Sequence, residues 1–268
     1  MFYARRYLES YWNTGETLLV VSLNIRKAFD MVSLDSIEVI LKELGVPQHI
    51  VNRVRQALNC ERASILWEGI ETEQKSKAKG IKQGCPMSPY IFTLIKQKVL
   101  KQTQAKIPTI NLLEINRKGL PVILAFADDL LLMVKTVKEI EEILKVLKFE
   151  LERVGLELNV DKSKVLIREP RFDRKIPENI ILNGEKFDVT NTLKYLGTYF
   201  TENLDRPKTT RIRCRQAIIC TKIVIEFMKK FKPSWHLAKL IYKTGIEPAI
   251  TYGLKAACLV KRNRQYKY

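Results

Sequence analysis

Two adjacent aspartates between two apolar runs are the residues of this sequence best suited to chemistry. Asp128 and Asp129 lie between the runs 122–126 and 130–134. The pattern predicts two short strands joined at a tip that carries both carboxylates. Adjacent carboxylates repel each other, and a divalent metal ion is their usual neutraliser. An Asp-Asp pair is also common in plain turns, so the pair alone leaves a metal site and a simple turn both open.

Other blocks of the chain carry polar residues in a fixed order around this pair. Residues 18–30 read Leu-Leu-Val-Val-Ser-Leu-Asn-Ile-Arg-Lys-Ala-Phe-Asp, and residues 80–89 read Gly-Ile-Lys-Gln-Gly-Cys-Pro-Met-Ser-Pro. Residues 155–163 read Gly-Leu-Glu-Leu-Asn-Val-Asp-Lys-Ser, and residues 194–197 read Lys-Tyr-Leu-Gly. Taken in order with Phe-Ala-Asp-Asp at 126–129, these blocks resemble the palm and the beginning of the thumb of reverse transcriptases from non-LTR (LINE-type) retrotransposons.

The resemblance implies an α+β polymerase of palm, fingers and thumb, which extends a DNA primer on an RNA template with deoxynucleoside triphosphates. It also implies two Mg²⁺ ions, one that activates the primer 3′-hydroxyl and one that neutralises the triphosphate. Asp128 matches the family's metal ligand in the hairpin, and Asp129 is its neighbour in the same cluster. Lys162 matches a lysine that assists the departing pyrophosphate, although a lysine beside a strand end is more often a solvated charge.

The resemblance also implies residues that bind the nucleotide and the primer. Phe29 matches the aromatic residue under the sugar, which excludes a 2′-hydroxyl and so selects deoxynucleotides; a phenylalanine there could equally be core. Gln83 and Gly84 match the loop that approaches template and nucleotide, where a glycine allows close approach. The turn Tyr195, Leu196 and Gly197 matches the segment that grips the primer end.

The match breaks at Asn24. The family strand ends here in an aspartate that bridges both metal ions, whereas an amide offers one carbonyl oxygen and no charge. Asp30 matches the aspartate that opens the following helix, so we interpret it as structural and not as a replacement ligand. We therefore expect a recognisable fold with impaired catalysis.

A second departure is length, because only 23 residues precede Asn24 where the family carries a basic fingers region. We expect an N-terminally truncated copy of the polymerase. Two alternatives stay open: a non-catalytic nucleic-acid-binding remnant, and a translated fragment without a selected role.

The elements that must position these residues follow from hydrophobic periodicity. The run 18–23 predicts a buried strand, and residues 62–80 predict a hairpin. Thr136 and Glu139 predict a capping box that begins a helix ending at Gly155. Further helices are expected from Ser33 to about 44, from about Pro47, after the N-cap Ser88, and after 206. Further strands are expected at 156–160, 164–167, 180–182 and 193–199. This order predicts an α+β fold and not alternating βαβ units.

The charge distribution favours a polyanionic partner, although charge alone leaves a solubilising surface or simple sequence drift open as well. The chain holds 47 Lys and Arg against 29 Asp and Glu, a net charge of +18, and residues 205–268 hold 16 basic and 3 acidic side chains, or +13. Basic side chains along one element gain affinity by displacing counterions from phosphates. We expect a palm with partial fingers at 1–204 (fingers at about 31–80) and a basic helical thumb at 205–268.

The apolar content of the chain also indicates where it acts. The longest apolar stretch, 121–134, is interrupted by Asp128 and Asp129, and the first twelve residues lack the order of a secretory signal. We therefore expect no membrane partner, and an intracellular location in the nucleus or cytoplasm.

Overall fold

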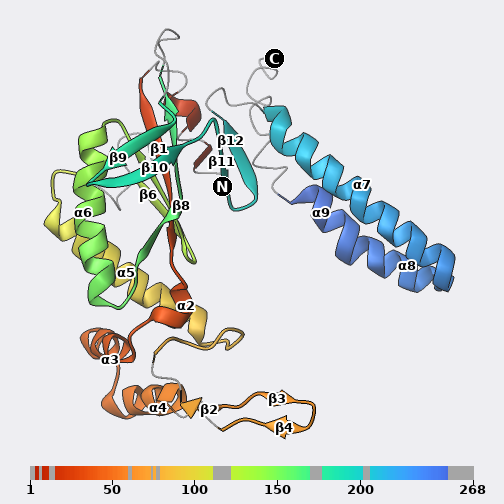
Figure 1. Ribbon diagram of the computed structural model, residues 1–268, viewed down its shortest axis with the longest axis horizontal. Helices are drawn as coiled ribbons and strands as arrows, with labels where there is room; N and C mark the ends of the chain where they lie inside the picture. Colours follow the sequence, from red (N-terminus) through yellow and green to blue (C-terminus); the bar gives the residue numbers. More distant parts are fainter. Residues whose placement is uncertain are drawn as a thin grey trace, which may run out of the picture. The chain divides into compact units, whose positions relative to one another are not determined.

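The computed structural model is divided into two compact units. It describes residues 4–5, 8–11, 16–59, 62–73, 75–76, 79–110, 122–169, 177–201 and 206–252. Residues 18–165 and 175–189 form what we call the sheet unit, and residues 1–17, 166–174 and 190–268 form the terminal unit. Figure 1 labels helices and strands of both units.

The sheet unit is built on a six-stranded sheet with the order β6-β7-β1-β8-β10-β9. Its strands are β1 Leu18–Ile25, β6 Ile123–Phe126, β7 Asp129–Val134, β8 Leu158–Arg168, β9 Asn179–Leu182 and β10 Glu185–Val189. β1 pairs with β7 antiparallel, and β10 pairs with β8 parallel. β1 and β7 are buried along almost their whole length, which explains their unbroken apolar sequences.

Helices of the sheet unit lie beside this sheet and at one end of it (Figure 1). They are α2 Ala28–Met31, α3 Leu34–Glu43, α4 Gln48–Asn59, α5 Ser88–Lys106 and α6 Val137–Arg153. α6 packs against β7 and β9, and α5 packs against α6. The predicted capping box is confirmed, because the Thr136 side chain accepts from the Glu139 backbone and the Glu139 side chain accepts from the Thr136 backbone. Ser33 is confirmed as the N-cap of α3.

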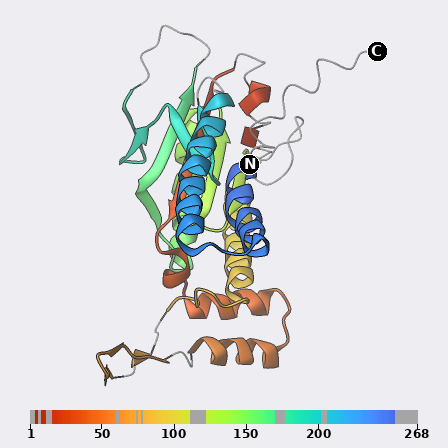
Figure 2. The same ribbon diagram turned by 90° about the vertical axis from the view of Figure 1, so that its right-hand side faces the viewer.

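The segment between α2 and α5 forms two helices and a long hairpin. α3 and α4 lie side by side (Figure 2). The hairpin predicted at 62–80 is confirmed as two short antiparallel ladders, of β2 Arg62–Ala63 with β5 Lys75–Ser76 and of β3 Leu66–Trp67 with β4 Ile70–Glu71.

Three local predictions were wrong. The strands expected at 156–160 and 164–167 are one strand, β8, which lies between β1 and β10 in the sheet. The strand expected at 193–199 is a hairpin of β11 Thr192–Tyr195 and β12 Thr198–Thr201, since Leu196 and Gly197 both adopt positive φ. The N-cap of α5 is Met87 and not Ser88, because the first helical hydrogen bonds already reach the Met87 carbonyl.

The terminal unit contains the β11–β12 hairpin and the C-terminal helices. α7 Arg206–Phe231 is followed by α8 Trp235–Ile241, the π-helix η1 Tyr242–Ile246 and α9 Glu247–Thr251. α7 packs alongside η1 and α9, as Figures 1 and 2 both show. The helical prediction after residue 206 is confirmed up to 251, apart from a break at 232–234, and its remainder at 253–268 lies outside the described residues. Within the described ranges, no helix is both long and apolar enough to cross a membrane.

Candidate active site

The turn between β6 and β7 carries the aspartate pair. Ala127 adopts a left-handed conformation with φ +46°, which is unfavourable for a residue with a Cβ atom. The Ile25 N–H of β1 donates to the Asp128 carbonyl at 3.2 Å. Asp129 is the first residue of β7 and lies opposite Asn24 in the β1–β7 register. The structure therefore confirms the hairpin and brings the pair beside Asn24.

The Asn24 side chain interacts with the pair through its amino group. Nδ2 donates to Asp129 Oδ1 at 3.4 Å, and the Asn24 backbone N–H donates to Ser163 Oγ at 3.3 Å. Burial raises the pKa of Asp129 above its usual value and the negative charge of Asp128 raises it further, while the hydrogen bond from Asn24 opposes both. The amide thus partly stabilises the Asp129 carboxylate instead of adding a third anionic ligand.

This set of ligands does not fit a pair of Mg²⁺ ions. Two hard cations need several anionic oxygens, and position 24 presents a donor to its neighbour. Across the part of the chain that the structure describes, no group of three or more His, Cys, Asp and Glu side chains is placed to hold a metal. The disagreement with the two-ion site that the resemblance implies lies at Asn24.

Lys96 of α5 is a neighbour of the pair that sequence reasoning missed. Its side chain is only 8% exposed, and Nζ donates to the Ala127 carbonyl at 3.1 Å. Burial lowers the pKa of Lys96, and the carboxylate of Asp128 opposes that shift. The sequence does indicate that Lys96 is buried, because position 96 follows Phe92 by one helical turn and so falls on the apolar face of the helix.

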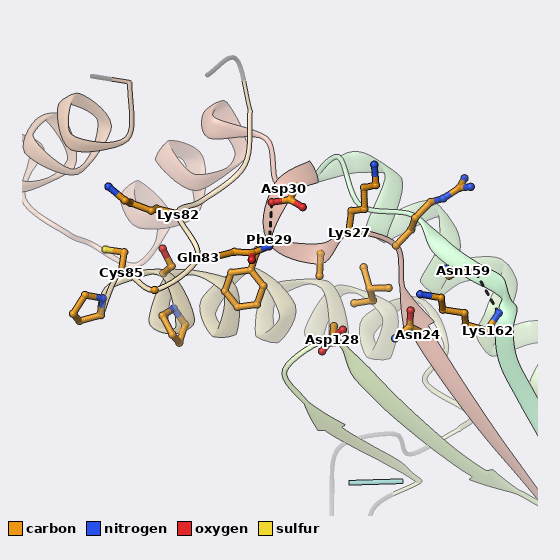
Figure 3. Close-up of a pocket in the computed structure, with 17 residues that line it drawn as sticks. Asn24, Lys27, Phe29, Asp30, Lys82, Gln83, Cys85, Asp128, Asn159 and Lys162 are labelled. Carbon is orange, nitrogen blue, oxygen red and sulfur yellow. Dashed lines mark hydrogen bonds between the residues drawn. The ribbon is translucent and has the colours of Figure 1, made fainter. Parts of the chain in front are cut away.

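A cavity of about 850 Å³ opens beside the pair (Figure 3). It is lined by the end of β1, by α2, by the loop before α5, and by Asp128, Asn159 and Lys162. The lining includes the following sequence-predicted site residues: Asn24, Phe29, Gln83, Gly84, Asp128 and Lys162. Asp129 stands outside this lining and is half-buried.

Contacts within the cavity fix several of these residues. The Phe29 ring stacks on the Phe92 ring with centroids 5.0 Å apart, and Gln83 Nε2 donates to Asp30 Oδ1 at 3.3 Å. Lys162 is exposed, and its backbone N–H donates to Asn159 Oδ1 at 3.2 Å. The Phe29 ring is therefore held by packing, whereas the Lys162 ammonium group is exposed to solvent.

The loop before α5 is attached to α2 through its backbone. Gly80 N–H donates to the Val32 carbonyl at 2.8 Å, and Ile81 N–H donates to the Phe29 carbonyl at 2.7 Å. Gly80 has φ +91°, and a Cβ atom there would lie 2.6 Å from the Asp30 carbonyl oxygen. This close approach sets one wall of the cavity.

The Tyr195–Gly197 turn belongs to the terminal unit, where two side chains fix its carbonyl groups. An Arg213 guanidinium nitrogen donates to the Gly197 carbonyl at 2.7 Å, and the Tyr252 hydroxyl donates to the Leu196 carbonyl at 3.2 Å. The Arg213 guanidinium also lies over the Tyr252 ring, 5.0 Å from its centroid. Nothing in the local sequence indicates these long-range partners.

We expect Arg213→Met to loosen this turn, because its charge-assisted hydrogen bond and its contact with the Tyr252 ring are both lost. The free energy of unfolding should fall by about 1–2 kcal/mol, and amide hydrogen exchange at Thr198 should become faster. Arg215→Met is the matched control, because Arg215 is exposed on the same helix. Equal effects of the two variants on stability and exchange would contradict the assignment.

Comparison with known sequences identifies relatives along most of the chain. Residues 3–200 match the family model described as reverse transcriptase (RNA-dependent DNA polymerase). The chain is 31% identical over 212 residues to a Pol polyprotein of the type-2 retrotransposable element R2DM of Drosophila melanogaster, covering 74% of this chain and 18% of that protein. It is 28% identical over 265 residues to a Pol polyprotein of a type-1 element R2 of Popillia japonica, covering 96% of this chain and 35% of that protein.

Solved structures show the same fold at low identity. Telomerase from Candida albicans, in a complex with a fragment of telomeric RNA, has a TM-score of 0.51 and 14% identity, covering 74% of this chain and 33% of that one. Apo telomerase from Candida tropicalis has a TM-score of 0.50 and 13% identity, covering 74% and 36%. The α+β polymerase fold that the sequence predicted is therefore confirmed. The chain spans about two fifths or less of the R2 polyproteins that it matches. With the family model matching most of its length, this chain belongs to the reverse transcriptases, the RNA-dependent DNA polymerases, of non-LTR retrotransposons.

Proposed function

We propose that this chain forms the palm, part of the fingers and the beginning of the thumb of an R2-like reverse transcriptase, with nucleotidyl transfer impaired at Asn24. The palm and partial fingers are 1–204, with fingers at about 31–80, and the thumb is 205–268. The observation that carries the proposal is the Asn24 amide, which faces Asp129 where the family pattern has a third carboxylate.

The cavity beside Asp128 is the proposed site for the incoming deoxynucleoside triphosphate. Its volume of about 850 Å³ lies within the range of small-molecule sites. Its lining includes the cationic side chains Arg26, Lys27, Lys82 and Lys162, which suit a polyanionic ligand.

Within this cavity we assign the nucleotide contacts to Phe29, Gln83 and Gly84. The Phe29 ring would pack under the sugar, and its stacking on Phe92 supports a fixed position there. Gly84 has φ +85°, and a Cβ atom at this position would have no other atom within 4 Å, so the backbone there is open to a ligand. Lys162 would meet the departing pyrophosphate.

The partners follow from the same assignment. An RNA template and a DNA primer would bind, with the primer end at the turn Tyr195, Leu196 and Gly197, whose carbonyls are fixed by Arg213 and Tyr252. Template and primer are intracellular molecules, so we place the activity in the nucleus or cytoplasm.

The residues of this chain match the family's divalent-metal site only in part. Reverse transcriptases use divalent metal ions in general, and two Mg²⁺ ions would be expected from the family. Asp128 and Asp129 supply two carboxylates, and the position that should bridge both ions is an amide. We therefore propose that metal binding, and with it transfer, is weakened but that the nucleotide cavity persists.

Primer extension tests the proposal. With an RNA template, a DNA primer, dNTPs and Mg²⁺, we expect the chain to extend the primer no more than a few-fold faster than its Asp128→Asn variant. The reason is that several kcal/mol of metal stabilisation are already missing. Robust Mg²⁺-dependent synthesis by the unmodified chain, abolished by Asp128→Asn, would overturn the impairment.

A non-catalytic nucleic-acid-binding role is the second candidate, and the +13 charge of residues 205–268 favours it. It predicts salt-sensitive binding to an RNA–DNA hybrid in EDTA, with affinity falling steeply as salt rises. This role also predicts that no substitution at Asn24 restores synthesis, which separates it from the first proposal.

A further inference from the structure

Lys96 places a positive charge inside the sheet unit, beside the Ala127–Asp129 turn. It lies on the face of α5 that also carries Phe92, Ile95 and Val99, all of which are buried. A lysine is rarely buried without a partner, because removing an ammonium group from water is unfavourable. The position therefore requires an interaction that offsets the loss of hydration.

The offsetting interaction is with the turn that carries the aspartate pair. Lys96 Nζ donates to the Ala127 carbonyl at 3.1 Å and lies 6.0 Å from the centroid of the Phe92 ring. Ala127 has φ +46°, a conformation that its neighbours must hold in place. Asp128 follows directly in the chain, and its negative charge acts on the ammonium group.

We propose that Lys96 is a built-in counter-cation of the Ala127–Asp129 turn. It holds the left-handed Ala127 through the carbonyl and offsets the negative charge of the two aspartates, as a divalent metal ion would. It is a positioning residue and not a catalytic one. This inference deepens the proposed function and rests on it for the identity of the turn.

The consequence for metal binding is physical and direct. A fixed positive charge next to Asp128 repels a divalent cation, and the repulsion in a partly buried site is worth more than in water. Asn24 removes one negative charge from the site, and Lys96 offsets another. Both residues shift the turn toward a state that is stable without metal and binds metal weakly.

Manganese binding tests the counter-cation role without nucleic acid or nucleotide. We expect Lys96→Met to bind Mn²⁺ about tenfold more tightly than the unmodified chain, as measured by the loss of the free Mn²⁺ signal in electron paramagnetic resonance. Lys96→Gln should also bind more tightly, because it keeps a donor for the Ala127 carbonyl but not the charge. Lys96→Arg should stay within about twofold of the unmodified chain.

The matched control is Lys101→Met, which removes the same charge from an exposed position of the same helix. It should change Mn²⁺ affinity by less than about twofold, because an exposed charge is screened by water and salt. Mn²⁺ affinities of Lys96→Met and Lys96→Gln no tighter than that of the unmodified chain would overturn the proposal.

A double-mutant cycle covers the case in which Lys96→Met is poorly stable. In EDTA, Asp128→Asn should lower the melting temperature of the unmodified chain, since it removes the partner of a buried cation. In the Lys96→Gln background, the same change should raise the melting temperature, because it relieves repulsion from Asp129. Additive effects would show that Lys96 is only a packing residue. Since neither measurement uses polymerase activity, failure here is distinguishable from failure of the proposed function.

Discussion

Asn24→Asp is expected to raise Mg²⁺-dependent primer extension on an RNA template by about 100-fold, which corresponds to about 2.7 kcal/mol of transition-state stabilisation. Position 24 ends the buried strand β1 and lies opposite Asp129 in the register with β7. A carboxylate there replaces an amide donor with anionic oxygens beside Asp128 and Asp129, the ligand type that Mg²⁺ prefers. The measurement is the rate of single-nucleotide addition at saturating primer-template.

Two control variants separate a ligand effect from a general change of charge. Asn24→Ala removes the amide without adding a carboxylate, and it should give no gain. Asn159→Asp adds a carboxylate to the same cavity but outside strands β1 and β7, and it too should give no gain in primer extension. A gain from Asn159→Asp equal to that from Asn24→Asp would contradict the ligand argument. No gain from Asn24→Asp would favour the non-catalytic role.

The effect of Asn24→Asp should also depend on the charge of Lys96. Three carboxylates without a metal repel one another, and Asp129 loses the hydrogen bond from Asn24. Lys96 then offsets part of this repulsion, because its ammonium group is anchored on Ala127 next to Asp128. The negative charge of the Asn24→Asp site is therefore offset by both the metal ion and Lys96, whereas that of the unmodified site is offset by Lys96.

The parts of the fold that could be predicted from sequence are those that local pattern determines. Apolar runs predicted β1 and β7, because strands buried on both faces have few polar residues. The apolar run of β6 was also predicted as a strand, although Ala125 and Phe126 at its end are exposed. The capping box of α6 was predicted because its two partners, Thr136 and Glu139, lie within one turn of helix. The continuity of β8 was not predictable, because the polar stretch 161–164 interrupts its apolar pattern.

The candidate site shows the same division. Phe29, Gln83 and Asp128 line one cavity although they are far apart in sequence. The turn at 195–197 belongs to the other unit and is not part of this cavity. Lys96 was missed because its partner, the Ala127 carbonyl, is a backbone atom that no sequence motif records. Arg213 and Tyr252 were missed for the same reason, since both donate to carbonyls of the turn at 196–197.

Gly80→Ala should have the largest effect on stability among the variants considered, because the added methyl group has no space. A Cβ atom at Gly80 would lie 2.6 Å from the Asp30 carbonyl oxygen and 2.9 Å from its Cα atom, all of it backbone. The positive φ of +91° adds strain for any residue other than glycine. We expect the free energy of unfolding to fall by about 3 kcal/mol or more in urea denaturation.

The loss should reach the cavity as well as the fold, because moving Gly80 away from Asp30 breaks the backbone hydrogen bonds that tie the loop to α2. Gly45→Ala is the matched control: its φ is +73°, and nothing lies within 4 Å of its built Cβ, so it reports conformational strain alone. That control should cost about 1 kcal/mol. If Gly80→Ala were no more destabilising than Gly45→Ala, the close approach of the loop to Asp30 would not be what fixes this wall, and the geometry assigned to Phe29 and Gln83 would lose its support.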